Sequence, residues 1–441
     1  MSKNIKPRLY KGTRDFLPEQ MIKRNYVITI IKNIFEKFGF DPLETPAMEL
    51  WETLSGKYGE EGDRLTYRFI DRGKREVGLR YDLTVPLSRV IALYPEISKP
   101  FKRYQIQPVW RADKPQKGRF REFYQCDIDI VGSTSMLADA EIISALYHVL
   151  RDLKFKKFTI RINSRKILSG ITEISGASLE KEAEVARSID KFDKIGLKGV
   201  REELISRGIE SRGADKILQV LGIEGSNKDR LRKLTDLLKT SKTGLAGIKE
   251  IEDLLNYLKM LEVPEQQILF DLYLARGLDY YTGPIYETVV DEPRIGSITG
   301  GGRYDNLIGL FSGQNQHATG SSIGLERIIT VMDELKMFPD DLKTSVEVLI
   351  TVFDTSCLPY SIKIANLLRQ ENINCDLYSG ESKLRGQFGL ANDRNIPIAV
   401  IAGPDEIKIN TVNIKNMRTG KQVNVPLENM VNEIRQQLRI K

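Results

Sequence analysis

The feature that most constrains the fold is the change of hydrophobic pattern along the chain. Between about residues 165 and 260 the pattern is helical, as in SLEKEAEVARSIDKF, with hardly any strand-like run. From about residue 343 strand-like and helical runs alternate, from VEVLITVF to IPIAVIAG. At 441 residues the chain is also too long for one compact core. We therefore expect three parts: a core of residues 1–164 and 261–335, a helical insertion at 165–260, and an α/β domain at 343–441.

Strand signals fill much of the expected core. FYQCDIDIV (123–131) and IYETVV (285–290) are rich in β-branched and aromatic residues, and SITGGGRYDNL (297–307) adds glycines where a ligand can approach closely. Parallel βαβ repeats are not evident, so the pattern indicates an α+β fold around a mostly antiparallel sheet. A helix is expected to start at Thr84 as its N-cap and to present residues 82–84 at its start.

Composition is that of an ordinary globular protein. Hydrophobic residues make up 41% and charged residues 29%, and no apolar run reaches membrane-spanning length. The N-terminus MSKNIKPRLYKGTRDF lacks the apolar stretch of a secretory signal, so we expect a cytoplasmic protein without a membrane partner. The net charge of +7 suits a polyanion partner, but a basic enzyme without such a partner fits equally well.

The few cysteines and histidines argue against several chemistries. Cys126, Cys357 and Cys375 are odd in number and have no CxxC spacing, which argues against disulfides and a zinc site and favours small core residues. His148 and His317 lie near no plausible motif for nucleophilic or acid–base catalysis. We therefore expect no catalytic triad, and spacing assigns no metal ligand.

A basic hairpin is predicted between Phe101 and Asp129. Two strand-like ends flank a charged middle that contains Arg111, Arg119 and Arg121. The rigid fork of arginine suits phosphate oxygens, and a neighbouring aromatic ring can stack on a base. On these residues alone, a solvated charged loop fits as well.

This segment, FKRYQIQPVWRADKPQKGRFREFYQCDID, resembles motif 2 of class II aminoacyl-tRNA synthetases, and is most similar to that of the histidyl enzymes. The resemblance implies that Arg111 holds the amino acid carboxylate and the α-phosphate of ATP. It also implies that Arg119 binds the γ-phosphate and that Phe123 stacks on adenine. These roles fit the chemistry of the side chains, because arginine binds carboxylate and phosphate oxygens and a phenylalanine ring stacks on a base.

Two further segments resemble the other class II motifs. GSSIGLERI (320–328) is similar to motif 3, in which small residues let strand and helix pack beside the nucleotide and Arg327 lies over ATP. DPLETPAMELWE (41–52) is similar to motif 1, whose proline, here Pro46, lies in the dimer interface of the family. Taken alone, the second segment fits an ordinary turn before a strand.

ARGLDYYTG (275–283) and GGRYDNL (301–307) resemble signatures that separate histidyl enzymes from other class II synthetases. A neutral imidazole needs an acceptor for its N–H and a donor to its other nitrogen, and the resemblance implies that Asp129 and Tyr281 supply them. A pocket built in this way rejects analogues that lack the group by about 10⁴ to 10⁵. Two more tyrosines would wall the pocket: Tyr280 and Tyr304.

The α-amino group of an amino acid is a cation and requires oxygen acceptors. The segment LRYDLT offers Asp82, Leu83 and Thr84, and the resemblance adds Gln125. Bacterial histidyl enzymes commonly carry glutamate at the positions of Asp82 and Asp129. The shorter aspartates predict a chain closer to the eukaryotic and archaeal branch.

Arg276 is, with Arg111, the predicted catalytic residue. In the family an arginine at this place lies against the α-phosphate, near the bound histidine, and does work that a magnesium ion does in other class II enzymes. Negative charge grows on the α-phosphate as the histidine carboxylate attacks and pyrophosphate leaves, and a fixed guanidinium stabilises that charge. From sequence alone, a structural arginine paired with Asp279 remains an alternative.

The resemblance extends from YKGTRDF (10–16) to the final helix. It implies ATP-dependent activation of L-histidine to histidyl-adenylate and transfer of histidine to the 3′ end of tRNA(His), by a homodimer, with Mg²⁺ expected on ATP. Residues 343–441 would bind the anticodon, and the insertion at 165–260 lies over the acceptor stem in related enzymes. No protein nucleophile is required, because the substrate carboxylate attacks first and a tRNA hydroxyl second.

Two other functions remain open at the level of sequence. One is a non-catalytic paralogue of the family, the regulatory subunit of the enzyme that starts histidine biosynthesis, which lacks the C-terminal domain. The other is an RNA-binding or nucleotide-sensing module that keeps the fold without turnover. Histidine-dependent exchange of pyrophosphate into ATP distinguishes the enzyme from both.

Overall fold

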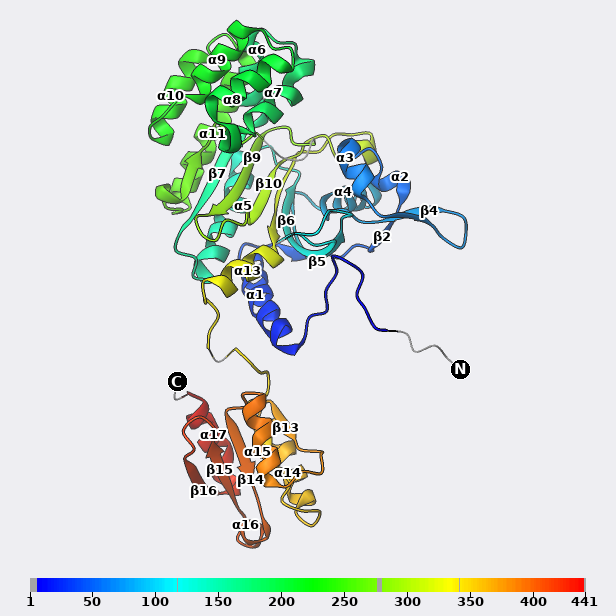
Figure 1. The fold of residues 1–441 in the computed structure, drawn as a ribbon, viewed down its shortest axis with the longest axis vertical. Helices are drawn as coiled ribbons and strands as arrows, with labels where there is room; N and C mark the ends of the chain where they lie inside the picture. The colour runs from blue at the N-terminus through cyan, green and yellow to red at the C-terminus, as the bar shows by residue number, and fades with distance from the viewer. Residues whose placement is uncertain (1–5, 117, 276–279, 341, 440–441) are drawn as a thin grey trace. The chain divides into compact units, whose positions relative to one another are not determined.

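The computed structural model describes residues 6–116, 118–275, 280–340 and 342–439. The chain divides into two compact units, each with a sheet of its own (Figure 1). Their bounds are Met1–Asp15 with Tyr26–Met337 for the first, and Phe16–Asn25 with Phe338–Lys441 for the second.

An eight-stranded sheet organises the first unit. Its neighbouring strands are antiparallel except at the two edges, where β1 pairs with β5 and β7 with β8 in parallel. The predicted α+β fold around a mostly antiparallel sheet is therefore confirmed. In spatial order the strands are β1 (Asp41–Pro42), β5 (Phe101–Trp110), β6 (Glu122–Val131), β11 (Ala318–Gly324), β10 (Thr299–Arg303), β9 (Pro284–Val290), β7 (Phe158–Ser164) and β8 (Ile268–Phe270).

The two faces of this sheet differ in polarity, as β6 illustrates. Side chains alternate along a strand, so Cys126, Ile128 and Ile130 share one face, and all three are buried. Helix α5 (Met136–Asp152) packs on the sheet with an apolar stripe that includes Ile142. The opposite face of β6 carries polar residues and faces away from this core.

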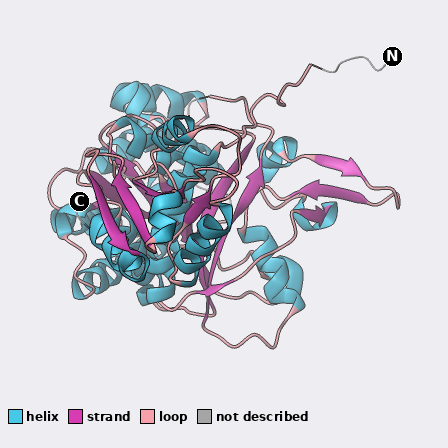
Figure 2. Cartoon of the chain, turned by 90° about the horizontal axis from the view of Figure 1, so that it is seen from below, coloured by secondary structure: helices cyan, strands magenta, loops and turns pink. Residues whose placement is uncertain are grey.

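A helix and a small sheet flank the polar face. Helix α4 begins at Thr84, but the predicted N-cap at Thr84 is wrong by one residue, because Leu83 occupies the cap position without a side-chain bond. The Asp82 carboxylate accepts from the Val85 N–H instead, at 3.1 Å. The helices of the first unit outside residues 165–260, besides α5, are α1 (Pro18–Lys37), α2 (Trp51–Leu54), α3 (Gly59–Leu65), α4 (Thr84–Leu93), α12 (Gly309–Ser312) and α13 (Leu325–Glu334). The small sheet is antiparallel and consists of β2 (Met48–Leu50), β4 (Glu76–Leu79) and β3 (Arg68–Ile70). It projects from the unit (Figures 1 and 2).

From Arg165 to Met260 the described chain contains helices only, as the hydrophobic pattern predicts. The chain leaves the eight-stranded sheet at the end of β7 and returns at the adjacent strand β8. Helices α6 and α11 pack closely because Gly170 faces Gly244, where a Cβ on Gly170 would lie 2.6 Å from the Gly244 Cα. The elements are α6 (Arg165–Ser175), η1 (Leu179–Lys181), α7 (Glu182–Ile189), α8 (Phe192–Ser206), α9 (Ser211–Leu221), α10 (Asn227–Leu237), α11 (Lys242–Met260) and η2 (Glu265–Gln267).

The second unit contains a five-stranded sheet with an apolar core between sheet and helices. Its first three strands are parallel, as the alternating pattern predicts, and a C-terminal hairpin that the pattern did not reveal extends the sheet in antiparallel fashion. The elements are β13 (Cys375–Leu377), β12 (Val348–Ile350), β14 (Ile398–Ile401), β15 (Thr411–Asn416), β16 (Gln422–Pro426), α14 (Leu358–Gln370), α15 (Leu384–Asp393), α16 (Pro404–Lys408), η3 (Leu427–Asn429) and α17 (Met430–Arg439).

Candidate active site

Three neighbouring strands form a polar surface on the first unit. Gln125, Asp127 and Asp129 alternate along β6 and therefore point to the same face. In register they lie opposite three polar residues of β5 and opposite three small residues of β11. These partners are Gln107, Gln105 and Arg103 on β5, and Gly324, Ser322 and Gly320 on β11.

Glycines keep part of this surface free of side chains. A Cβ on Gly320 would overlap the Oδ1 atom of Asp129, so only glycine leaves that carboxylate its place. At Gly302 a Cβ would lie 2.7 Å from the Pro284 carbonyl oxygen and 3.0 Å from the Tyr281 ring. No atom of the described residues lies within 4 Å of the Cβ position at Gly300, so these residues leave space beside β10.

Asp129 is held by two side chains. Its Oδ2 atom lies 2.7 Å from Arg103 Nη2, and the two side chains are 3% and 0% exposed. Its Oδ1 atom accepts a hydrogen bond from the Tyr304 hydroxyl. Burial raises the pKa of Asp129, whereas Arg103 and the Tyr304 hydrogen bond lower it. The carboxylate is thus fixed in orientation, and its lone pairs can accept a further donor.

Asp82 is the acceptor of a second cluster. It accepts hydrogen bonds from the Tyr58 hydroxyl at 3.0 Å, from the Val85 N–H at 3.1 Å and from the Tyr280 hydroxyl at 3.3 Å. Burial raises the pKa of Asp82, and the Val85 hydrogen bond and the Arg111 charge oppose that effect. The start of α4 therefore presents a buried carboxylate toward the tyrosines.

The predicted tyrosines gather beside these carboxylates. The Tyr280 ring lies 5.1 Å from the Tyr281 ring and 5.8 Å from the Tyr304 ring, in edge-to-face contacts. Burial and the charges of Asp129 and Asp82 raise the pKa of Tyr281. Tyr281 therefore stays protonated at neutral pH and keeps its hydroxyl proton available for donation.

Leu83 and Thr84 lie at the start of α4, next to Asp82. The Leu83 carbonyl oxygen accepts from Arg103 Nη2 at 3.2 Å, which ties the helix start to β5. The Thr84 hydroxyl hydrogen-bonds with Tyr280. The structure thus brings Asp82, Leu83 and Thr84 together with Tyr280, as the sequence predicts.

Arg111 lies at the end of β5 between two aromatic rings. Its Nε donates to the Tyr81 carbonyl oxygen at 3.0 Å, and its guanidinium carbon lies 4.3 Å from the centre of the Tyr81 ring and 5.1 Å from that of Phe123. These contacts fix the guanidinium near Asp82 while its Nη atoms can still donate. Arg111 and Phe123 are therefore adjacent, as expected for residues that would share one nucleotide.

The loop between β5 and β6 contains Arg119. This residue is exposed, and its backbone pairs with Gln116 at 2.8 Å and 3.1 Å. Its side chain is therefore not among the buried groups of the site. Arg327 lies near this loop, because a Cβ on Gly118 would be 3.7 Å from Arg327 Cγ, and it donates from Nη1 to the Ser297 carbonyl oxygen.

The N-terminal segment packs against the same loop. The Arg121 N–H donates to the Gly12 carbonyl oxygen at 2.8 Å, and Arg121 Nη1 donates to the Tyr10 hydroxyl at 2.7 Å. Glu326, the neighbour of Arg327, accepts from the Tyr124 N–H at 3.1 Å and so joins α13 to β6. The segments YKGTRDF and GLERI therefore brace the hairpin from two sides.

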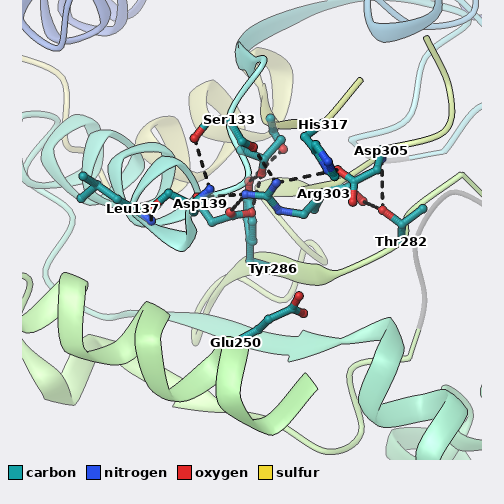
Figure 3. Close-up of polar contacts among 12 residues, drawn as sticks. Ser133, Leu137, Asp139, Glu250, Thr282, Tyr286, Arg303, Asp305 and His317 are labelled. Carbon is teal, nitrogen blue, oxygen red and sulfur yellow. Dashed lines mark hydrogen bonds and ion pairs between the residues drawn. The ribbon is translucent and has the colours of Figure 1, made fainter. Parts of the chain in front are cut away.

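A buried network behind the sheet anchors β10 (Figure 3). Arg303 donates to the Ser133 and Ser135 carbonyl oxygens at 2.8 Å and 3.0 Å and pairs with Asp139 of α5. Asp305 lies 3.7 Å from Arg303 and 3.2 Å from His317 Nδ1. Because Arg303 immediately precedes Tyr304, this network fixes the strand that carries Tyr304 toward Asp129.

Sequence comparisons cover both units. A family model described as histidyl-tRNA synthetase matches residues 12–328, and one described as an anticodon binding domain matches residues 347–437. A histidine–tRNA ligase of Phocaeicola vulgatus is 43% identical over 444 residues, which cover 95% of this chain and 96% of the relative. One of Cytophaga hutchinsonii is 42% identical and covers 97% of this chain and 99% of the relative.

The chain belongs to the histidyl-tRNA synthetase family. A solved histidyl-tRNA synthetase from a Nostoc species superimposes with a TM-score of 0.88 at 32% identity over 98% of this chain and 100% of that one. A Bacillus halodurans structure, described as an ATP phosphoribosyltransferase regulatory subunit or histidyl-tRNA synthetase, has a TM-score of 0.74 at 20% identity and covers 88% of this chain and 97% of that one, which shows the fold alone. The class II fold with a C-terminal anticodon-binding domain is thereby confirmed.

One prediction about this histidyl-tRNA synthetase family member is not supported. The aspartates at positions 82 and 129 predicted a chain closer to the eukaryotic and archaeal branch, whereas the relatives with more than 40% identity over nearly the whole chain are bacterial. A one-carbon difference in an acidic side chain preserves its charge, so it is a poor marker of branch.

One predicted site residue lies outside the described residues, and three site residues were not predicted. The first is Arg276, the predicted catalytic arginine. Arg103, Asp127 and Tyr58 were missed, although polar residues at every second position of QIQ and of QCDID indicate the polar face of a strand. Tyr58 has no such signal, because it reaches Asp82 from a segment 24 residues away in sequence.

The described residues of this family member contain neither a metal-binding cluster nor a membrane-spanning helix. No group of three or more His, Cys, Asp or Glu side chains is placed there to hold a metal ion. None of the described helices combines the length and apolar character needed to cross a membrane.

Proposed function

We propose that this chain is a histidine–tRNA ligase. It activates L-histidine with ATP to histidyl-adenylate, releases pyrophosphate, and transfers histidine to the 3′ end of tRNA(His). The observation that carries the proposal is the buried polar face of β5 and β6 in a chain that is 43% identical to a histidine–tRNA ligase over 95% of its length.

The histidine pocket is proposed to lie over this face. Asp129, oriented by Arg103 and Tyr304, accepts the imidazole N–H, and Tyr281 donates to the other ring nitrogen. Tyr280 closes one wall. Because the pocket's own polar atoms are buried, an analogue without the ring nitrogens leaves them unpaired and is rejected.

The α-amino group is proposed to bind Asp82, Thr84 and Gln125, beside Leu83. This placement is supported by the hydrogen bonds that hold Asp82 at the start of α4. Burial removes the hydration that stabilises the charge of a carboxylate. An ammonium group bound next to the carboxylate compensates for this loss by ion pairing.

ATP is proposed to bind beside the hairpin. Arg111 contacts the histidine carboxylate and the α-phosphate, and Phe123 stacks on adenine, which agrees with their contact at 5.1 Å. Arg119 binds the γ-phosphate, and Arg327 lies over ATP. The exposed position of Arg119 leaves its guanidinium accessible to a phosphate group.

Chemistry is proposed to need no protein nucleophile. The histidine carboxylate attacks the α-phosphorus, the bond to the β-phosphate oxygen breaks, and pyrophosphate leaves. Arg276 and Arg111 stabilise the charge that grows on the α-phosphate oxygens. The terminal ribose hydroxyl of tRNA then attacks the carbonyl carbon of the adenylate and displaces AMP.

Magnesium is proposed to enter with ATP. Among the described residues no group of His, Cys, Asp or Glu side chains is placed to hold a resident ion. Phosphate oxygens and water normally supply most of its ligands in such sites.

The partners and the place of action follow from the same proposal. Residues 343–441 bind the anticodon of tRNA(His), residues 165–260 form a separate insertion over the acceptor stem, and residues 1–164 with 261–335 form the catalytic core. The protein acts in the cytoplasm. A homodimer through the Pro46 region is supported by the small sheet, which exposes apolar side chains such as Ile70, 68% exposed.

Exchange of pyrophosphate into ATP, measured with each amino acid separately, tests the activity. We expect exchange that depends on histidine, and charging of tRNA(His) when the RNA is added. Replacing Arg276 by alanine should slow exchange by about 10² to 10³, as loss of one transition-state donor does elsewhere. The control is Arg75→Ala, on a side chain that is 71% exposed in the β3–β4 turn.

Two outcomes would contradict the proposal. Absence of exchange with every amino acid would favour the non-catalytic paralogue or an RNA-binding module. Exchange that stays within a factor of a few in Arg276→Ala would remove the phosphate role of that arginine while leaving the activity itself in place.

A further inference from the structure

Asp127 is a buried carboxylate for which the proposed function gives no role. Its side chain is 2% exposed and lies between Gln125 and Asp129 on the polar face of β6, level with Ser322 of β11. Within the described part of the chain its Oδ1 atom has no hydrogen-bond partner. A buried oxygen of this kind is costly to leave unpaired, so it calls for a ligand that supplies a donor.

A second unpartnered acceptor lies two residues away on the same face. Gln125, 8% exposed, donates from Nε2 to the Ser322 hydroxyl at 2.8 Å, and its Oε1 atom has no partner among the described residues. Gly300 pairs with Ser322 on the next strand and has open space where a Cβ would lie. Open space therefore lies beside β10 at the level of Ser322, whose partner on β6 is Asp127.

The neighbouring carboxylates are already engaged. Asp82 accepts three hydrogen bonds from the protein, and Asp129 is bound by Arg103 and Tyr304. A carboxylate has about four lone-pair positions, so both keep room for at least one further donor. Within the described residues Asp127 Oδ1 has no hydrogen-bond partner, whereas Asp129 Oδ2, which also lacks a hydrogen bond, is paired with Arg103.

The charges around Asp127 favour a cation. The pKa of Asp127 is raised to about 7: burial and the charges of Asp129 and Asp82 raise it, whereas Arg103 and a hydrogen bond from Ser322 lower it. A positive ligand charge would stabilise the ionised form. The charged and titratable groups that face Asp127 are Arg80, Arg103, Asp82, Asp129 and Tyr281.

We propose that Asp127, together with Gln125, binds the α-ammonium group of the amino acid substrate. The inference rests on the proposed function, because it assigns a further residue to the same pocket. An ammonium group has three donors; Asp127 Oδ1 and Gln125 Oε1 accept two of them, and the third is left for the acceptors at the start of α4, Asp82 and Thr84. A neutral imidazole has a single N–H, which Asp129 accepts, so the ammonium is the group that matches two unused acceptors.

Two substrate analogues test the assignment in the full-length protein. Histidinol keeps the ammonium and the imidazole, whereas 3-(imidazol-4-yl)propanoate lacks the ammonium. Their inhibition constants are measured by histidine-dependent pyrophosphate exchange in the wild type and in Asp127→Asn, which preserves shape and removes charge. Histidinol and histidine should bind about 10- to 100-fold more weakly to the variant, as expected for a charged hydrogen bond, and the propanoate should change less than about threefold.

Controls separate this role from a structural one. If Asp127 only supported the strand, both analogues would weaken together, and that result would overturn the proposal, as would unchanged binding of histidinol. Should Asp127→Asn not fold, Asp127→Ser removes the same charge with less bulk and gives the same readout. Ser321→Ala is the control for a lost hydrogen bond on β11, because the Ser321 hydroxyl donates to the Gly300 carbonyl oxygen at 3.1 Å from the opposite face of the strand, and its effect should be the same for both analogues.

Failure of the proposed function would look different. In that case the wild type itself would show no histidine-dependent exchange. A wild type that is active with histidine, and an Asp127→Asn variant with the same histidinol affinity, would refute the role of Asp127 alone.

Discussion

Replacement of Arg103 by methionine tests whether one buried ion pair holds the proposed histidine pocket. Arg103 Nη2 lies 2.7 Å from Asp129 Oδ2, and neither side chain exceeds 3% exposure. Methionine is unbranched, apolar and flexible, so it can fill the space without charge. Asp129 would then retain only the hydrogen bond from Tyr304.

The expected loss of stability is large. Removing one partner of a buried pair costs about 3–5 kcal/mol, and full burial of both side chains means that solvent screening does not reduce this range. The reverse variant, Asp129→Asn, should cost less, because Arg103 still donates to the Leu83 carbonyl oxygen at 3.2 Å and to Gln105 at 3.3 Å.

The loss should also depend on pH. Arg103 lowers the pKa of Asp129 in the folded state, so its removal moves that pKa further above the unfolded value. An acid with a raised folded-state pKa binds more protons when folded, and stability falls as pH rises toward that pKa, by up to about 1.4 kcal/mol per pH unit. Arg103→Met should therefore lose more stability at pH 8 than at pH 5.

Hydrogen exchange of peptides from β5 and β6 measures the opening free energy of this region separately from the second unit. The double variant Arg103→Met, Asp129→Asn is the control and should recover part of the loss, because it removes both charges. A loss below about 1 kcal/mol in Arg103→Met, equal at pH 5 and pH 8, would refute the reasoning.

Three further predictions concern the same face. Gly320→Ala should raise KM for histidine at least about tenfold with little change in KM for ATP, because its Cβ would displace the Asp129 carboxylate. Asp127→Asn should stabilise the ligand-free protein at pH 8 by up to about 4 kcal/mol and have little effect near pH 4, because the pKa of Asp127 is raised to about 7; thermal unfolding measures this. Tyr58→Phe should weaken histidine binding by about 1–3 kcal/mol in calorimetry, because Asp82 loses a hydrogen bond of 3.0 Å.

Each of these predictions has a contradicting result. Equal changes in both KM values for Gly320→Ala would indicate a general distortion of the sheet. A ligand-free Asp127→Asn protein that is less stable than the wild type at pH 8 would show that the carboxylate is well satisfied. Unaltered histidine affinity in Tyr58→Phe would mean that other donors hold Asp82 in place.

Much of the fold could be predicted from local pattern. The β-branched and aromatic residues of FYQCDIDIV predict β6, and the helical run of residues 165–260 corresponds to α6–α11. The hairpin β15–β16 was not predicted, because its outer strand is largely exposed and lacks the apolar character that marks a core strand. Periodicity thus identified elements with a strongly apolar face and missed those without one.

The site residues likewise include some that the sequence predicted and some that it did not. Asp82, Asp129 and the tyrosines are brought together as the motifs predict, whereas Arg103 was missed because an arginine inside a strand is normally assigned to solvent. Its partner Asp129 lies 26 residues later in the sequence (103 to 129), on the neighbouring strand. Only the register of β5 against β6 places Arg103 opposite Asp129. Pairing between strands is non-local, so a motif within one segment cannot reveal it.

The polar face explains why these acids lie side by side despite their repulsion. Arg103 neutralises Asp129, and three donors hold Asp82, but Asp127 keeps an oxygen without a partner among the described residues and has a raised pKa. On the proposed function, the ligand-free protein is therefore least stable where the substrate ammonium group would bind. An ammonium group would supply the missing positive charge, so part of the selectivity for an amino acid would arise from relief of an unfavourable buried carboxylate. The same carboxylate would then lower the stability of the free protein and raise its affinity for histidine, and a single substitution, Asp127→Asn, should change the two in opposite directions.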